Sequence, residues 1–248
     1  MTGELVTRTD DGGLCTLTLN RPDKLNSINH AMFVDLDRHV RALESACDNI
    51  GCVVVRGAGR CFSAGHDLSD ISDGDTQDFG FESAVIERLA NLPQAVVSAV
   101  HGHCYTGALE LALAGDIILA SENARMADTH AKWALTPVWG MSLRLPRRVG
   151  FAKAREMMFT ARTVTGEQAA AMGLANACYP DASFDAEVSA FVADILANSP
   201  YSIAGYKALM AETDGMPLRM GLAHEVHNTR GVGPDMHDRI AAFANRKK

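Results

Sequence analysis

The sequence predicts an α/β protein: a parallel sheet covered by helices on both faces, followed by a helical region at the C-terminal end. Apolar runs without polar alternation occur at 52–55, 95–100 and 116–120, and segments with helical periodicity separate them. Strands of this kind are typical of parallel sheets whose two faces are both buried. After Gly150 the pattern becomes helical to the end of the chain.

The junction at Ser199-Pro200 divides the chain into two expected parts. We expect an α/β core over 1–198 and a helical region over 199–248. The apolar side chains of the helical region include Met216, Leu218, Met220, Leu222 and Val226. So short a segment cannot bury that surface alone, so it must pack on the core or on another subunit. We therefore expect a homo-oligomer.

The first elements are a hairpin and a helix. The runs 5–9 and 14–19 flank Asp10-Asp11-Gly12-Gly13, and the second run alternates, which predicts a hairpin. Asn29 is a typical N-cap for a helix over 30–47. The apolar residues on one face of that helix are Phe33, Leu36, Val40 and Leu43.

Helices then alternate with the three buried strands. The further helices that we expect in the core lie at 82–92, 107–114, 151–160, 166–172 (capped by Thr165) and 185–197. Three short helices are expected after Pro200. The repeated order of strand, turn and helix is consistent with a parallel sheet.

The composition excludes several classes of function. A net charge of -7 argues against a nucleic-acid binder that relies on phosphate neutralisation. No apolar run approaches the ~20 residues that a membrane span needs, and no signal peptide is visible at the start. The six cysteines form no CxxC pair, which favours buried reduced thiols over disulfides or a zinc site. We expect a cytoplasmic protein with neither membrane nor nucleic-acid partners.

Motifs for other chemistries are incomplete. Gly57-Ala58-Gly59 follows a strand, as a dinucleotide-binding loop does, but Phe62 replaces the third glycine and no helix is expected there. The segment 224–227, HEVH, is one residue short of the HExxH zinc motif. Neither a GxxxxGK[ST] loop nor a GxSxG elbow occurs. We therefore expect neither a metal nor a nucleotide cofactor.

Two segments of small residues follow buried strands, at 61–68 and at 100–111. Small residues let a ligand approach the backbone and leave amide N–H groups as donors. Gly107 lies in the first turn of an expected helix, where N–H groups have no intrahelical acceptor and the helix dipole adds positive charge. If the amide of His66 points to the same place, the two donors form an oxyanion hole.

Glu110 follows Gly107 by three residues, within about one helical turn of this place. A lone carboxylate is costly to bury in the otherwise apolar segment 108–114, which favours a catalytic role. A glutamate that interacts favourably with the helix dipole explains the residue equally well. On these grounds alone both interpretations stay open.

Several short motifs follow one another in order along nearly the whole chain. They are Leu19-Asn20-Arg21-Pro22 with Lys24-Leu25-Asn26-Ser27, Phe62-Ser63-Ala64-Gly65-His66-Asp67-Leu68, Gly115-Asp116-Ile117, the run from Pro137 and Gly140 through Arg144-Leu145-Pro146 to Val149-Gly150, and Gly166-Glu167-Gln168-Ala169 with Met172-Gly173-Leu174-Ala175. Each motif is weak alone, but the ordered set is very specific. By these motifs the sequence resembles the enoyl-CoA hydratase/isomerase (crotonase) superfamily.

The resemblance implies a crotonase-like spiral of ββα repeats with a C-terminal helical trimerisation region, and hence a homotrimer or a hexamer. It implies an acyl-CoA thioester held at its carbonyl by the amides of His66 and Gly107, with coenzyme A as part of the substrate and no other cofactor. The positions that bind or shape the family's CoA pocket match Lys24, Leu25, Ala64, Asp67 and Leu68, and more loosely Lys207, Phe243 and Lys247. Aromatic residues that would narrow the acyl pocket, or else pack in the core, are Tyr105, Trp133 and Trp139.

The two catalytic glutamates of the family's hydratases match Glu110 and His130. The second position is therefore a histidine in this chain, which departs from the family pattern. A neutral imidazole can still hydrogen-bond a water molecule or shuttle a proton. We expect an enoyl-CoA hydratase-like lyase that hydrates a 2-enoyl-CoA, or runs the reverse dehydration, with Glu110 assisted by His130.

Other functions stay open at this point. An enoyl-CoA isomerase or a decarboxylase would use Glu110 alone, and His130 would then be a structural residue. A non-catalytic acyl-CoA-binding protein would keep the CoA pocket and abandon the second acid–base group.

Overall fold

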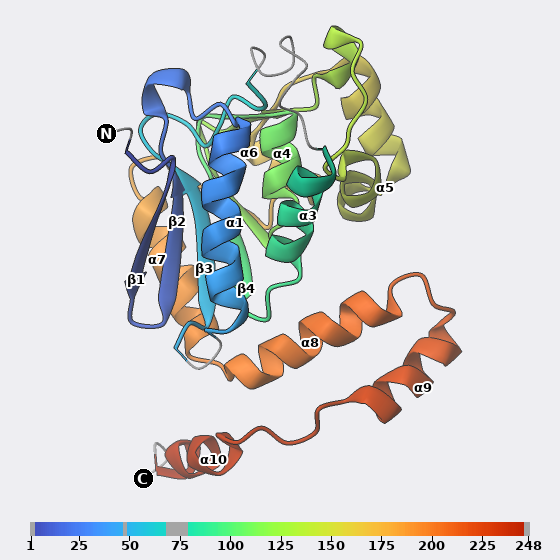
Figure 1. Ribbon diagram of the computed structural model, residues 1–248. Coiled ribbons are helices and arrows are strands. Elements are labelled where there is room, and N and C mark those ends of the chain that lie inside the picture. The colour runs from blue at the N-terminus through green and yellow to red at the C-terminus, as the bar shows by residue number, and fades with distance from the viewer. Residues whose placement is uncertain (1–2, 47–48, 68–78, 246–248) are drawn as a thin grey trace.

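The computed structural model describes residues 3–46, 49–67 and 79–245, and its centre is a six-stranded sheet (Figure 1). In spatial order its strands are β1 (Val6–Asp11), β2 (Leu14–Leu19), β3 (Cys52–Gly57), β4 (Ala95–Val100), β6 (Ile117–Ser121) and β9 (Ala177–Tyr179). β1 and β2 form the expected antiparallel hairpin, and every other pair is parallel. The three predicted inner strands are thus confirmed, with shifts of at most two residues at an end.

Helices cover both faces of this sheet, as the sequence predicts. In front of it lie α1 (His30–Glu44), α3 (Phe79–Ala90) and α4 (Gly107–Ala112), and behind it lies α7 (Phe184–Leu196) (Figure 1). Val53 and Val55 of β3 belong to the large core under the front helices, whereas Cys52 and Val54 belong to the cluster under α7. Successive strand residues therefore bury opposite faces, which is why this run is apolar throughout.

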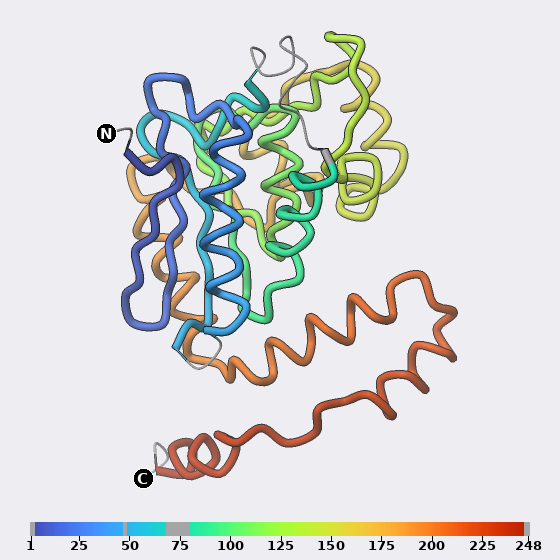
Figure 2. The backbone as a smooth tube through the Cα atoms, viewed as in Figure 1, coloured from blue at the N-terminus to red at the C-terminus, as the bar shows by residue number. Residues whose placement is uncertain are grey.

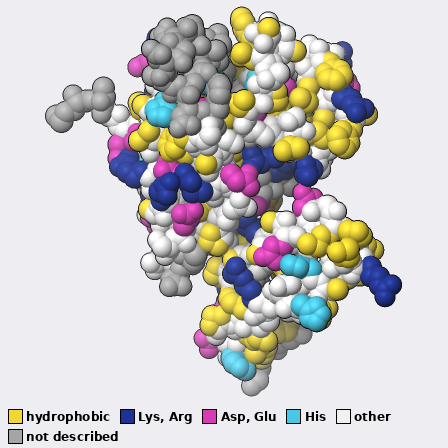
Figure 3. Space-filling model, turned by 45° about the vertical axis from the view of Figure 1, so that its right-hand side comes forward, with side chains coloured by type: hydrophobic (Ala, Val, Ile, Leu, Met, Phe, Trp, Pro, Cys, Tyr) yellow, Lys and Arg dark blue, Asp and Glu magenta, His cyan; other side chains and the backbone are white. Residues whose placement is uncertain are grey.

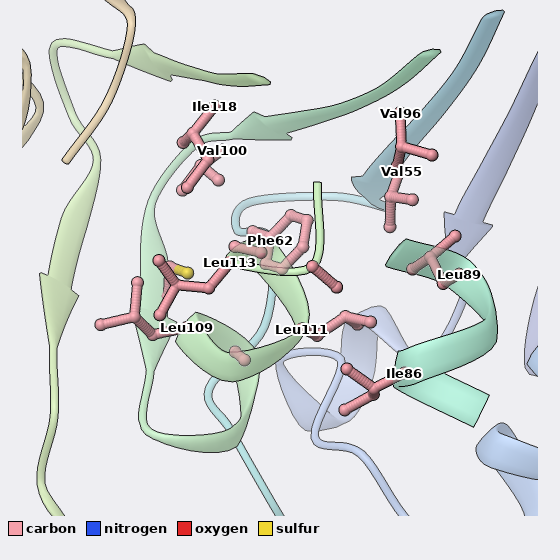
Figure 4. Close-up of a cluster of buried hydrophobic side chains, with 14 of the residues drawn as sticks. Val55, Phe62, Ile86, Leu89, Val96, Val100, Leu109, Leu111, Leu113 and Ile118 are labelled. Carbon is pink, nitrogen blue, oxygen red and sulfur yellow. The ribbon is translucent and has the colours of Figure 1, made fainter. Parts of the chain in front are cut away.

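The larger core lies between the sheet and the helices α3 and α4. Figure 4 shows Phe62 surrounded there by aliphatic side chains of these two helices and of the sheet. Phe62 is fully buried, although it lies in the loop that follows β3. An aromatic ring anchored in the core fixes the start of this loop, and the loop leads to His66.

A second sheet has three short strands: β5 (His103–Tyr105), β7 (Arg125–Ala127) and β8 (Val164–Thr165). β5 pairs parallel with β7, and β7 pairs antiparallel with β8. The sequence does not predict these strands, because two or three residues are too few to show a period. The sheet matters for the site, since β5 leads into α4 and β7 leads to His130.

Of the helices after β6, α5 begins ten residues earlier than the sequence predicts, whereas α6 begins at the predicted residue. The elements before Pro200 that have not yet been named are η1 (Pro22–Lys24), η2 (His130–Trp133), α5 (Met141–Thr160) and α6 (Gly166–Ala171). Only the half of α5 after Gly150 is predicted, because Gly150 (φ 75°, ψ 157°) interrupts the helix and Pro146 lies in its first half. Thr165 caps α6 through a capping box, which confirms that prediction.

The C-terminal helices extend away from the sheet and its covering helices (Figures 1 and 2). They are α8 (Pro200–Thr213), α9 (Leu218–Asn228) and α10 (Met236–Asn245). Their apolar side chains are largely exposed in a single chain (Figure 3), and the larger ones are Met210, Leu218, Met220, Leu222, Val226, Ile240 and Phe243. None of the described helices is long and apolar enough to cross a membrane.

One buried asparagine links the loops that lead to the site. The side chain of Asn26 donates to the carbonyls of Ala58 (2.8 Å) and Cys61 (2.9 Å) and accepts from the amide of Arg21 (2.9 Å). Asn26→Ala leaves these three backbone groups without that partner. We therefore expect the free energy of unfolding of the Asn26→Ala variant, measured by urea denaturation, to be about 3 kcal/mol lower than that of the wild type.

The exposed Asn198 offers a matched control, because its side chain donates to one carbonyl, that of Asp194. Asn198→Ala is expected to change the free energy of unfolding by less than about 0.5 kcal/mol. Equal effects of the two substitutions would contradict this role of Asn26.

Candidate active site

The four residues for which the sequence predicts a catalytic or carbonyl-binding role line a single cavity of about 300 Å³. Glu110 and His130 contribute side chains to its wall, and His66 and Gly107 lie at the same wall. Its apolar lining includes Tyr105, Trp133, Leu135, Val138 and Trp139. The cavity therefore combines an apolar surface with a few polar groups, as sites for small organic ligands do.

Hydrogen bonds between the loop after β3 and the segment from the end of β4 into β5 bring His66 close to Gly107. The amide of Phe62 donates to the carbonyl of His101 (2.7 Å), and the amide of Ser63 donates to that of His103 (2.9 Å). A Cβ added to Gly107 would lie 3.4 Å from the backbone nitrogen of His66. The backbones at 66 and 107 thus lie side by side, as an oxyanion hole requires.

Thr106 turns the chain from β5 into α4. Its backbone has φ 53° and ψ −110°, a strained conformation for a β-branched residue. Its amide donates to the carbonyl of Ala127 (2.8 Å), and its hydroxyl is hydrogen-bonded to the hydroxyl of Thr129 and accepts from the Thr129 amide (3.1 Å). These bonds hold the turn that makes Gly107 the first residue of α4, where its amide has no intrahelical acceptor.

The carboxylate of Glu110 is 1% exposed and is held by backbone amides. One oxygen, Oε1, accepts from the amides of Trp139 and Met141, each at 3.0 Å. Burial raises the pKa of this carboxyl above its ordinary value, although the Met141 amide, the charge of His130 and the Trp139 amide lower it. The oxygen Oε2 is therefore the one suited to accept a proton.

His130 lies between two carboxylates. Its Nε2 is 3.7 Å from Oε2 of Glu110, and its Nδ1 is hydrogen-bonded to Oδ1 of Asp128 at 2.6 Å. Burial alone lowers the pKa of His130, but the hydrogen bond and charge of Asp128, together with the charge of Glu110, outweigh it and raise this pKa. The site thus contains a buried carboxylate beside an imidazole that readily carries charge.

Trp139 lines the cavity and also packs in the core. Its ring lies 4.8 Å from the ring of His66 and 4.8 Å from that of Phe33, centroid to centroid. Its indole N–H donates to Glu82, a buried carboxylate on α3 (3.2 Å). Because its amide also holds Glu110, Trp139 fixes the position of the carboxylate relative to the cavity.

The predicted CoA-binding residues occupy different places. Ala64 lines the cavity, and its amide donates to the carbonyl of Leu25 (2.9 Å). Asp67 forms an ion pair with Arg21 (3.0 Å), and Lys24 lies in η1; neither is part of the cavity wall, and nor is Leu25. Among the looser matches, Lys207 is paired with Asp116 (2.7 Å), outside this wall, and Phe243 is exposed on α10. Leu68 and Lys247 lie outside the described residues.

Asp128 and the Thr106–Thr129 pair are site features that the sequence does not single out. The only local signal for Asp128 is an acidic residue two positions before His130. Across the described ranges, no three or more His, Cys, Asp or Glu side chains are grouped as metal ligands.

Backbone donors beside a buried carboxylate and an imidazole are the elements of proton-transfer chemistry on a carbonyl compound. Residues 9–248 match the model of the enoyl-CoA hydratase/isomerase family. The chain belongs to this family, and it is therefore an enzyme of the crotonase superfamily with the crotonase fold.

Individual relatives include both hydratases and isomerases. The chain is 31% identical to the probable peroxisomal enoyl-CoA hydratase 1 of Arabidopsis thaliana, over 89% of this chain and 83% of the relative. It is 32% identical to the 1,2-epoxyphenylacetyl-CoA isomerase of Escherichia coli (strain K12), over 95% and 93%. A crystal structure of a putative enoyl-CoA hydratase from Thermobifida fusca YX in complex with acetoacetyl-CoA matches with a TM-score of 0.83, at 26% identity over 98% and 96%.

The close packing at Gly107 makes a methyl group there harmful. The added Cβ of Gly107→Ala would overlap the ring of Trp139, whose amide holds Glu110. We expect kcat to fall about 10²- to 10³-fold, because both the Gly107 amide and the Glu110 carboxylate are displaced. Steady-state kinetics on a folded variant, checked by circular dichroism, measure this.

Gly3→Ala, at an exposed position before β1, is the control, since its added Cβ would meet nothing within 4 Å. It is expected to retain the wild-type kcat. Wild-type turnover by Gly107→Ala would show that this packing does not matter for catalysis.

Proposed function

We propose that this enzyme hydrates a 2-enoyl-CoA or runs the reverse dehydration. One observation carries the proposal: Oε1 of Glu110 is occupied by two amides, while Oε2 faces the imidazole of His130 in the cavity where the backbones of His66 and Gly107 meet. This arrangement provides two proton-carrying groups and two backbone donors. Addition of water across a conjugated double bond can use all four.

The backbone donors act on the thioester carbonyl. The amides of His66 and Gly107 hold its oxygen, which becomes negatively charged when the double-bond electrons move toward the carbonyl. Donors fixed in place before the reaction stabilise this enolate oxygen without reorganising. The family membership and the acetoacetyl-CoA complex of a relative support an acyl-CoA thioester as the ligand.

Glu110 activates the attacking water. Its Oε2 accepts a proton while the water oxygen forms a bond to Cβ. The 3.7 Å between Oε2 and Nε2 of His130 exceeds a hydrogen bond, so one water lying to the side can contact both atoms. His130 assists by holding this water and by moving the second proton.

Residues beside the cavity are candidates for binding the CoA moiety. We assign the CoA pocket to Lys24, Leu25, Ala64, Asp67 and Leu68; the position of Ala64 in the cavity wall and its bond to Leu25 support this.

We also propose that other copies of this chain cover the exposed apolar side chains of α8–α10, giving a trimer or hexamer. Light scattering would then give three or six times the mass of a single chain.

Double-bond isomerisation is the second candidate. It needs one base that removes a proton from one carbon and returns it to another, and Glu110 with its raised pKa meets that need. The identity to an isomerase is as high as that to a hydratase. The difference between the two reactions lies in whether His130 is required.

If the enzyme catalyses hydration, its activity should depend on the side chains of both Glu110 and His130. We expect Glu110→Gln to lower kcat with crotonyl-CoA about 10²- to 10⁴-fold, and His130→Ala to lower it to a similar extent. The loss of absorbance of the conjugated thioester measures the rate. Loss of turnover in Glu110→Gln alone would favour isomerisation, and tight binding of CoA esters without turnover of any substrate would favour a carrier.

We also expect Glu110 to lower the stability of the fold at neutral pH, although the enzyme needs it for activity. Its pKa is raised in the fold, so the folded state favours the protonated form, and this stabilisation is lost as the pH rises through the raised pKa. At pH 7 ionisation of Glu110 therefore costs stability, and Glu110→Gln is expected to keep or raise Tm. A large drop in Tm at pH 7, measured by calorimetry, would contradict the prediction.

A further inference from the structure

One oxygen of Asp128 makes two contacts with His130. Oδ1 accepts from the backbone amide of His130 at 3.1 Å and lies 2.6 Å from its Nδ1. Asp128 is 1% exposed and His130 is 8% exposed. Because Asp128 and His130 are two residues apart in a tight turn, these contacts restrict both the backbone and the ring. The imidazole is therefore held in a single orientation.

This orientation fixes the role of each ring nitrogen. A carboxylate can only accept, so the proton on Nδ1 is directed to Asp128. Nε2 then faces the cavity, 3.7 Å from Oε2 of Glu110. In the charged ring Nε2 carries a proton that it can donate, and in the neutral ring it carries a lone pair. Asp128 thus leaves one titrating position, and it is the one that faces the site.

The charged groups near His130 favour the imidazolium. Asp128 lies just after β7, and Glu110 reaches the ring from α4. The other titratable side chains that line the cavity are His66, Tyr105 and Lys132. Lys132 is exposed to solvent on η2, where its charge is screened. Two buried carboxylates, one on either side of the ring, therefore dominate the field that it experiences.

Resting on the hydration proposed above, we propose that Asp128 is a positioning residue that holds His130 as an imidazolium, whose Nε2–H gives Cα its proton. Glu110 takes one proton from water while the hydroxyl group bonds to Cβ. The double-bond electrons move to the thioester oxygen held at residues 66 and 107. When the enolate collapses, its electrons bond to the proton from Nε2, which leaves the imidazole neutral.

The same geometry returns the site to its starting state. After the reaction Glu110 is protonated at Oε2 and His130 has a bare Nε2, and these atoms are 3.7 Å apart. A small movement or one water carries the proton from Oε2 to Nε2. The net change is the addition of one water to the substrate. Neither group needs to exchange a proton with bulk solvent between turnovers.

A titration of His130 tests the positioning role without any substrate. The full-length enzyme, labelled with ¹³C at histidine, is titrated by NMR, and the His130 signal among the nine histidines is identified by its loss in His130→Gln. We expect a wild-type midpoint above the ordinary value of about 6.5. In Asp128→Asn it should fall by about one unit or more.

Kinetics with crotonyl-CoA then test the consequence for the reaction. We expect Asp128→Asn to lower kcat about 10- to 100-fold, part of what general acid–base groups contribute, with KM changed less than about twofold. The alkaline limb of the kcat–pH profile should move to lower pH with the NMR midpoint. Asp181→Asn, at an exposed carboxylate that accepts from the Asn123 amide, is the control and should match wild type.

An unchanged His130 midpoint in Asp128→Asn overturns the proposal. So does a wild-type midpoint at or below the ordinary value, a measurement that stands even if the variant does not fold. If both midpoints behave as expected but crotonyl-CoA and other enoyl-CoA esters are not hydrated, the role of Asp128 on His130 is supported and the proposed hydration fails.

Discussion

The buried carboxylate of Glu110 is the constraint on which the rest of the site depends. An ionised group with 1% exposure is tolerated only where hydrogen bonds replace the water that it has lost. Those bonds come from the amides of Trp139, two residues before α5, and Met141, the first residue of α5. The segment between η2 and α5 must therefore follow one path. That path also places the Trp139 ring against Gly107 and His66.

The fold supplies this path through its smaller sheet. β5 and β7 are each three residues long, yet the residues that follow them carry both halves of the site. Thr106 follows β5 and Thr129 lies two residues after β7, and their hydrogen bonds tie the two strand ends together. A strained turn persists only where its surroundings over-determine it. Here the surroundings are the segment that presents His130.

Much of the fold is visible in the sequence, and less of the site. The strands at 52–55 and 95–100 are predicted because continuous apolar runs identify strands buried on both faces. Glu110 stands out because it is charged in an apolar segment. Asp128 does not, since its importance depends on a contact with His130 that only the folded turn creates. The Thr106–Thr129 pair depends on two strands that are too short to show a pattern.

The hairpin at the margin of the large sheet has a consequence for how molecules meet in solution. β1 is an edge strand. Its second half, residues 9–11, is exposed and ends in two aspartates. Arg8 is paired with Asp10 along the same strand. Charged side chains on an open edge oppose the docking of a strand from a neighbouring molecule. The central sheet is thereby discouraged from growing beyond its own chain into an aggregate.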